Sequence, residues 1–159
     1  MIAVEKPVLS KLLKPNVNRR IFNVDLHAGL VGTGLIGDAR SLATRAREEA
    51  FNFRETYDTD ITGQALAERV SLYLQAYTLY SSVRPFGTIS IMGLVDRDGP
   101  HLYMLEPSGA YWGYRACAAG KGRQVAKSEL EKLDMENMST LQAVKEAARM
   151  YQLAISDID

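Results

Sequence analysis

The stretch that decides the fold is AGLVGTGLIGDAR, residues 28–40. Its small and apolar residues over Ala28–Gly34 predict a strand that packs tightly on both faces. The glycines predict a close turn, and Asp38 is favourable near the positive end of a helix that follows. From Asp38 to about Arg54 the residues are good helix formers, with apolar side chains at spacings of three and four. The stretch therefore predicts a strand that leads directly into an amphipathic helix.

The sequence on both sides of this strand and helix predicts further elements that adjoin them. Upstream, the β-branched and aromatic run Arg20–Val24 and the turn at Asp25–His27 predict a hairpin with the strand at 28–34. Downstream, Asp60 or Thr62 can cap a second helix. Its apolar stripe, at steps of four and three, consists of Leu66, Val70, Tyr73, Tyr77 and Tyr80. The tyrosines favour core packing over a cofactor site and leave contact with another protein open.

After Pro85 the pattern changes to strands. Strands are predicted over 88–95, 101–105 and 110–116, joined by turns at Asp98-Gly99 and Glu106–Gly109, as an antiparallel meander. Two helices then follow, one over 121–133 and one from the capping-box pattern at Ser139 to Ile158. The order of strands, two helices, strands and two helices predicts an α+β fold whose helix pairs cover opposite faces of the sheets.

The composition is that of a globular chain. With 159 residues, 47% hydrophobic and 24% charged, the chain fits a single domain over 1–159. Nineteen basic residues balance nineteen acidic ones, so the basic excess typical of a nucleic-acid binder is missing. No apolar run is long enough for a membrane span, and Met1–Glu5 does not read as a signal peptide. The one cysteine, Cys117, excludes an internal disulfide framework and fits a reducing compartment.

One motif suggests that the chain binds a nucleotide. Gly32–Gly37 matches G-x-G-x-x-G between a predicted strand and a helix, where backbone N–H groups could face a pyrophosphate. A Rossmann unit needs a parallel strand after that helix, whereas here a second helix follows. We favour glycines that permit a close strand-to-helix turn, with a dinucleotide-binding protein as an alternative.

Catalytic and metal-binding groups are sparse. Two histidines, His27 and His101, and one cysteine make a zinc site improbable, and we expect no metal and no cofactor. Both histidines lie near predicted turns and are expected at the surface, and Cys117 is expected to be a buried, small apolar residue. The carboxylates Asp25 and Asp38 have no partner that would make an acid–base pair. This pattern counts mildly against an enzyme.

Several motifs together resemble the proteasome alpha subunits. The sequence GLIGDAR at 34–40 resembles their G-L-x-A-D-A-R element, VRPFG at 83–87 their R-P-F-G element, and EPSG at 106–109 their Asp/Glu-P-S-G element. The runs RIFNVDLH at 20–27 and AYTLY at 76–80 look most like the alpha type-3 subfamily, often counted seventh in the ring. The elements occur in the family's order and spacing over essentially all of the chain.

This resemblance implies the four-layer αββα sandwich of the N-terminal-nucleophile hydrolases. It also implies a partial domain, truncated at both ends, that lacks the gating tail and first helix and the C-terminal end. The implied function is that of a non-catalytic structural subunit of the 20S alpha ring in ubiquitin-dependent protein degradation, in cytoplasm and nucleus. The implied partners are neighbouring alpha subunits, beta-ring subunits and the C-termini of activators, with no nucleic acid and no membrane. The implied structural signature residues are Asp38, Arg40, Arg84, Pro85, Phe86 and Gly87.

The resemblance gives Arg20 two meanings. Active members of the fold use an N-terminal threonine beside a lysine, whereas this chain begins Met1-Ile2 and has the permanently charged Arg20 at the lysine position. In alpha subunits the same position lies in a pocket that receives an activator's C-terminal carboxylate, with Gly34 and Leu35 as its backbone wall. Arg20 as a solvated or interface cation is the alternative. A self-standing hydrolase of the same fold would need an N-terminal Thr, Ser or Cys.

Overall fold

The chain forms one antiparallel sheet with helices on both sides. The computed structural model describes residues 1–8 and 10–156. Its elements are β1 (Ile21–Asp25), β2 (Ala28–Gly34), α1 (Ile36–Tyr57), α2 (Gly63–Ala76), β3 (Thr88–Asp96), β4 (Gly99–Leu105), β5 (Tyr111–Gly113), α3 (Arg123–Leu130) and α4 (Thr140–Ser156). The five strands pair in sequence order, each antiparallel to the next. The predicted hairpin, meander and order of elements are confirmed.

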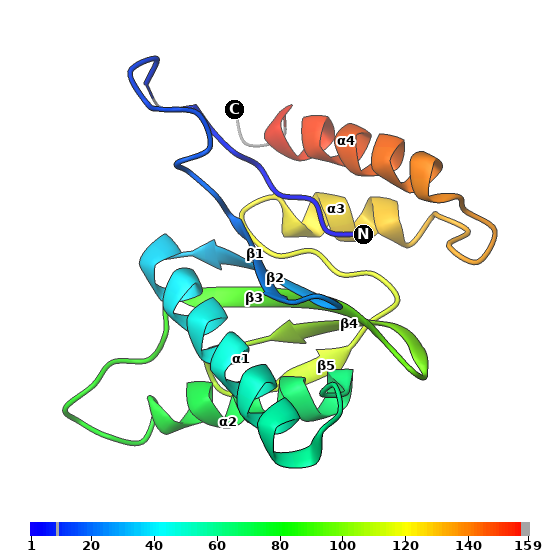
Figure 1. Cartoon of the computed structure of the whole chain (residues 1–159). Coiled ribbons are helices and arrows are strands. Elements are labelled where there is room, and N and C mark those ends of the chain that lie inside the picture. The colour runs from blue at the N-terminus through cyan, green and yellow to red at the C-terminus, as the bar shows by residue number, and fades with distance from the viewer. Residues whose placement is uncertain (9, 157–159) are drawn as a thin grey trace.

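The helix pairs lie on opposite sides of the sheet (Figure 1). Helix α1 packs on β1, β2 and β3, and α2 packs on β3, β4 and β5. Helices α3 and α4 pack on each other, and within the described part of the chain the backbone of neither helix comes close to the backbone of a strand. This confirms the α+β class, and the described residues form one of the two sheets expected of the αββα sandwich.

Residues 1–20 connect the sheet to the α3–α4 pair. Ile2 lies against β3, where its Cδ1 is 3.2 Å from the position that a Cβ on Gly93 would take. Three residues later, the Glu5 N–H donates to the Tyr151 hydroxyl of α4 at 2.6 Å. The N-terminal segment therefore contacts both the second face of the sheet and the helix pair beyond it.

The main core lies between the sheet and α1–α2. Along β3, alternate side chains are buried on this face, as expected of a strand with one face towards a core. The helices contribute Ala39, Leu42, Ala43, Ala46, Ala50, Leu66, Ala67, Val70 and Leu74 to the same cluster. The alanines of α1 let the helix approach β2 closely, and a Cβ on Gly32 would lie 2.3 Å from Ala39 Cβ. Burial of this cluster is the main favourable contribution to folding.

The α3–α4 pair is held differently. Helix α3 has no buried residue. The Glu129 carboxylate accepts hydrogen bonds from Lys132 at 2.5 Å and forms an ion pair with Arg149 of α4 at 2.9 Å. These contacts lower the pKa of Glu129, with the Lys132 hydrogen bond as the largest cause. Exposed ion pairs contribute little to stability, and close approach also joins the two helices, since a Cβ on Gly122 would lie 2.6 Å from Ala154 Cβ.

Several predicted boundaries were wrong. Helix α2 begins after the cap at Thr62, whose hydroxyl accepts from the Ala65 N–H, but it ends at Ala76 rather than near Tyr80. The Tyr77 and Thr78 N–H groups donate to the Leu74 and Gln75 carbonyls, three residues back, so the α-helical pattern is replaced by tighter turns. As a result Tyr80 is exposed, although Tyr73 and Tyr77 pack on the core as predicted.

The other boundary corrections concern the second half of the chain. Strand β5 covers 111–113 rather than 110–116. Helix α3 begins after Gly122 and ends at Leu130, shorter at both ends than the predicted 121–133, because residues 121–122 and 131–132 form turns. Helix α4 follows the predicted capping box, in which the Ser139 N–H donates to the Gln142 side chain. Its predicted end at Ile158 lies outside the described residues.

Among the described residues, no helix has both the length and the hydropathy needed to cross a bilayer.

Candidate functional site

Hydrogen bonds at Asp38 join the N-terminus of α1 to the loop before β3; we call this set of hydrogen bonds the Asp38 lock. The Arg84 guanidinium donates to both carboxylate oxygens of Asp38, at 2.7 and 2.9 Å, and the Gly87 N–H donates to Asp38 Oδ2 at 2.8 Å. These hydrogen bonds, the one from Arg84 above all, lower the pKa of Asp38 to about 2. Two signature motifs that lie 46 residues apart in sequence therefore meet at one carboxylate.

Gly34 and Leu35 form a backbone wall beside the same loop. The Leu35 N–H donates to the Gly87 carbonyl at 2.8 Å. Gly34 has φ +110°, and a Cβ there would lie 2.3 Å from the Gly87 oxygen. Only glycine fits this position, because a side chain would be both strained and blocked. The Leu35 side chain is exposed next to this wall.

The remaining signature residues play unequal parts. Phe86 is buried against Tyr73 and Tyr77, with ring centroids 5.7 and 4.8 Å away. The Tyr77 hydroxyl, 3.0 Å from the hydroxyl of Tyr73, raises the pKa of Tyr73 to about 12 together with burial. The Pro85 carbonyl accepts from Arg84 Nη1 at 3.0 Å. Arg40 is exposed and lines a shallow hollow of about 440 Å³ on the outer side of α1.

Arg20 lies at the same end of the sheet, on the neighbouring strand. Extending the register that pairs Ile21 with Val31 places it opposite Gly32, two residues before Gly34. Its Nε is buried and has no hydrogen-bond partner among the described residues. Burial is the largest cause of the raised pKa of Tyr151 in α4, and the positive charge of Arg20 acts in the opposite direction, lowering that pKa. Within the described part of the chain, no hydrogen bond joins Arg20 to the wall of Gly34 and Leu35.

The glycine motif does not build a dinucleotide site. The strands that flank it pair antiparallel, and α1 is followed by a second helix. Gly32 is needed for packing, since a Cβ there would meet Ala39 and Thr88. The first turn of α1 already holds the Asp38 carboxylate, and negative charge at this point disfavours a pyrophosphate. The geometry supports the close strand-to-helix turn.

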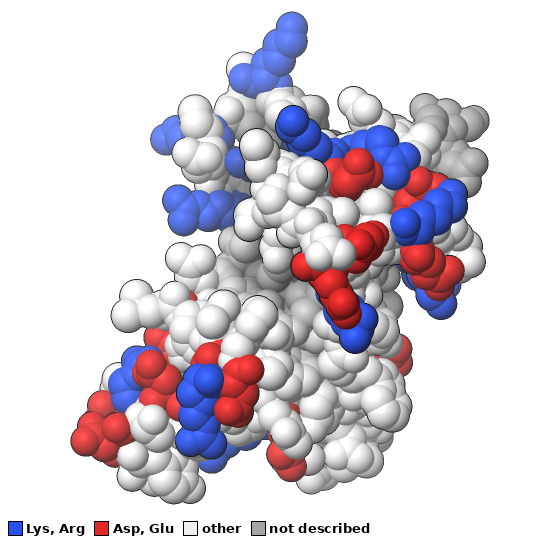
Figure 2. Space-filling model, turned by 90° about the vertical axis from the view of Figure 1, so that its right-hand side faces the viewer, with Lys and Arg blue, Asp and Glu red and all other residues white. Residues whose placement is uncertain are grey.

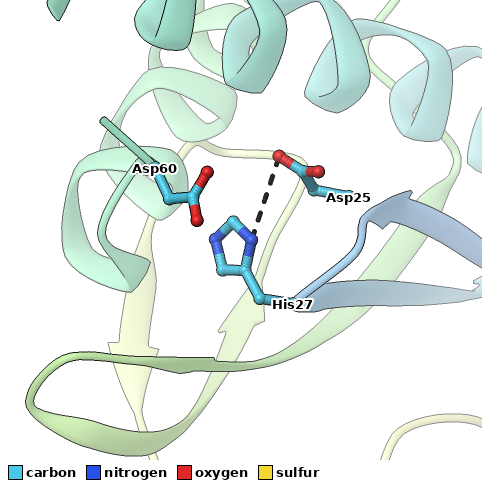
Figure 3. A group of neighbouring side chains, drawn as sticks. All are labelled: Asp25, His27 and Asp60. Carbon is cyan, nitrogen blue, oxygen red and sulfur yellow. Dashed lines mark ion pairs between the residues drawn. The ribbon is translucent and has the colours of Figure 1, made fainter. Parts of the chain in front are cut away.

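The one potential metal cluster among the described residues already contains a cation. Asp25, His27 and Asp60 place ligand atoms within 4.8 Å of one another (Figure 3). The Arg54 guanidinium donates to Asp25 Oδ2 at 2.6 Å and to Asp60 Oδ1 at 2.7 Å. His27 Nε2 lies 3.0 Å from the Ile61 carbonyl. The cluster therefore joins the β1–β2 turn to the α1–α2 loop, and Arg54 pairs with both of its carboxylates.

The expected surface position of the histidines was wrong. The His27 side chain is only 15% exposed, and His101 is half-buried with its Nε2 3.0 Å from Asp96 Oδ1. Turn position alone did not reveal this, because Ile61 reaches His27 from the α1–α2 loop. Cys117 is half-buried, and burial raises the pKa of its thiol to about 11, which keeps it protonated near neutral pH.

Comparison with known proteins agrees with this architecture. The family model for proteasome subunits matches residues 1–159, and the chain belongs to the proteasome subunit family. Within that family, the chain is similar to subunits named alpha type-3 and alpha type-7. The chain is 54% identical over 150 residues to the proteasome subunit alpha type-3 of Acanthamoeba castellanii, covering 94% of this chain and 60% of that protein.

Two yeast proteins show similar identity. The probable proteasome subunit alpha type-7 of Schizosaccharomyces pombe is 53% identical over 150 residues, covering 94% of this chain and 59% of the relative. The protein of the same name from Saccharomyces cerevisiae is 54% identical over 160 residues, covering 99% and 56%. The resemblance to alpha subunits is thus confirmed, and the chain spans about three-fifths of the length of these relatives.

Proposed function

We propose that the chain is a structural, non-catalytic subunit of the alpha ring of a 20S proteasome, acting in ubiquitin-dependent protein degradation. The observation that carries the proposal is the lock of Asp38 to Arg84 and Gly87, which joins the two motifs most characteristic of alpha subunits. The large apolar side chain of Leu35, next to Gly87, is exposed, as are Leu79 and Tyr80 in the segment that leads from α2 to Arg84. Exposed apolar groups on a braced loop suit contact with neighbouring subunits.

A structural role also agrees with the chemistry of the side chains. Arg20 occupies the position of the catalytic lysine in active relatives, and a guanidinium does not lose its proton to act as a base. The Cys117 thiol, with a pKa of about 11, is a poor nucleophile at neutral pH. A self-standing hydrolase is therefore the weaker alternative. We place the chain in cytoplasm and nucleus, with alpha and beta subunits as its partners.

The assembly itself is testable. Co-expressed with the other alpha subunits of its own source, the full chain is expected to enter a ring, because its braced loop and apolar groups need partners. Native mass spectrometry measures the result. Arg84→Met, which breaks the lock, is expected to reduce incorporation severalfold, whereas Arg97→Met, an exposed arginine of the β3–β4 turn, serves as a matched control. A stable wild-type monomer in the presence of all partners would contradict the proposal.

Arg20, Gly34 and Leu35 are proposed to form the pocket for an activator's C-terminal carboxylate. The positive charge of Arg20 supports this, because a guanidinium binds a carboxylate through charge-assisted hydrogen bonds. In the assembled ring, Arg20→Ala is expected to weaken binding of activator C-terminal peptides about tenfold, the effect of a charge-assisted hydrogen bond. Fluorescence polarisation with labelled peptides measures the affinity.

Two controls make this test specific. Arg97→Ala removes an exposed charge outside this pocket, in the β3–β4 turn, and is expected to leave the affinity nearly unchanged. Peptides with an amidated C-terminus are expected to bind wild type and Arg20→Ala equally. Unchanged affinity of Arg20→Ala for the free-carboxylate peptide would identify Arg20 as an interface cation only.

A further inference from the structure

A cationic stretch precedes β1 in a chain that is neutral overall. We call residues 6–8 and 10–19 the basic segment; it contains Lys6, Lys11, Lys14 and Arg19, and no acidic residue. All four cations are exposed, and none forms an ion pair with the described residues. In Figure 2 the uppermost projection of the molecule carries blue side chains without red ones beside them. The positive charge of the segment is thus uncompensated.

Two consecutive turns give the basic segment a defined shape. In the first, the Leu13 N–H donates to the Ser10 carbonyl at 3.2 Å and the Leu12 N–H donates to the Ser10 hydroxyl at 3.1 Å. In the second, Asn16 follows Pro15 with φ +63°, the conformation required after proline in a type II turn. A segment already bent by turns loses less conformational entropy when it binds a partner.

Large apolar side chains lie between the cations. Leu12 is 94% exposed and Val8 is 78% exposed, while Val17 is about half exposed. Exposed apolar groups on a turn gain free energy when a partner covers them. The basic segment therefore offers two kinds of contact at once, cationic and apolar.

We propose that the basic segment is a docking surface for an acidic segment of a partner protein, in which carboxylates alternate with apolar side chains. Carboxylates complement Lys11, Lys14 and Arg19, and the apolar groups cover Leu12 and Val17. A nucleic-acid backbone would satisfy the cations but would leave Leu12 uncovered, and the neutral chain lacks a wider basic surface. An anionic membrane favours a basic amphipathic helix, whereas this segment is built of turns. The surface excludes Arg20 and does not depend on the carboxylate pocket.

The proposal predicts binding that depends on both charge and apolar contact. The probe is a fluorescein-labelled, C-terminally amidated synthetic peptide of repeating Glu-Leu-Gly units, added to the full chain at low salt. The triple variant K11E, K14E, R19E is expected to weaken binding at least about tenfold, since attraction becomes repulsion. L12S is expected to weaken it about threefold. Added salt is expected to weaken the wild type and not the triple variant.

A matched variant controls for net charge. K121E, K145E and R123E reverse three exposed charges of the α3–α4 side and are expected to leave the affinity nearly unchanged. Equal loss in this variant, or equal binding of a Gln-Leu-Gly peptide, would overturn the proposal. Tighter binding of single-stranded DNA or of phosphatidylserine vesicles than of the peptide would also overturn it. Arg20→Ala is expected to bind this amidated probe as wild type does, so the outcome is separate from that of the carboxylate pocket.

Discussion

Gly32→Ala is expected to lower the free energy of unfolding by about 3 kcal/mol, the upper range for overpacking a core. An alanine Cβ at this position would lie 2.3 Å from Ala39 Cβ and 2.9 Å from Thr88 Oγ1. Strand β2 and helix α1 would have to separate, and the whole core between them would lose contact. Urea denaturation followed by circular dichroism measures the change.

Gly37→Ala is the matched control within the same glycine motif. A Cβ at Gly37 meets nothing within 4 Å, and the residue lies in the first turn of α1. This variant is expected to gain about 0.5 kcal/mol, because alanine is the better helix former. If Gly32→Ala fails to fold, Ala39→Gly in the same chain is expected to restore folding by removing the opposing Cβ. Equal effects of the two alanine variants would contradict the packing explanation.

Asp38→Asn is expected to lower the free energy of unfolding by about 2 kcal/mol at neutral pH, because the Arg84 and Gly87 hydrogen bonds lose their charged acceptor. The folded-state pKa of Asp38 is lowered from 3.8 to about 2, first by Arg84 and then by Gly87. The unfolded chain therefore binds this proton more readily than the folded chain. The stabilisation is fully present above pH 3.8 and is lost as the pH falls through about 2.

The pH dependence distinguishes this ion pair from a simple packing effect. The difference in stability between wild type and Asp38→Asn is expected to shrink as the pH falls from about 4 to 2, measured by urea denaturation at each pH. Glu55→Gln, at an exposed position of the same helix, is the control and is expected to show little change. Arg84→Met combined with Asp38→Asn is expected to cost little more than either alone. A stability difference that stays constant with pH would contradict the role of the pair.

Local pattern was sufficient for most of the fold. The glycine-rich run before Asp38 predicted the passage from β2 into α1, because close packing requires small residues on both sides of the turn. The change of period after Pro85 predicted β3 to β5, and the capping box at Ser139 predicted the start of α4. The residues at which helices and strands end were harder to predict from the sequence. Helix α2 ends where the Tyr77 and Thr78 N–H groups change to partners three residues back, and apolar spacing does not report this change.

The candidate site could be predicted from the sequence only in part. The motifs around Asp38 and Arg84 were recognised separately, and the hydrogen bonds that join them are set by the meeting of α1 with the loop before β3. The same limit applies to His27, since its partners come from β1 and from the loop after α1. An arginine at the predicted end of a helix, Arg54, was the only local sign that carboxylates lay nearby. Contacts between residues distant in sequence depend on tertiary geometry, and spacing does not encode it.

Because the backbones of α3 and α4 lie away from the strands, these two helices need not unfold together with the sheet. Since α3 buries no residue, and Glu129 and Arg149 form part of its contact with α4, the two helices can separate without breaking any strand pairing of the sheet. The free energy of that local opening depends on ionic strength, because added ions screen exposed charge pairs. The unit of sheet, α1 and α2 also carries ion pairs, such as Asp38 with Arg84, but it has the buried apolar core in addition. We therefore expect the α3–α4 pair to open at a lower free energy than this unit unfolds, with residues 1–20 in contact with both.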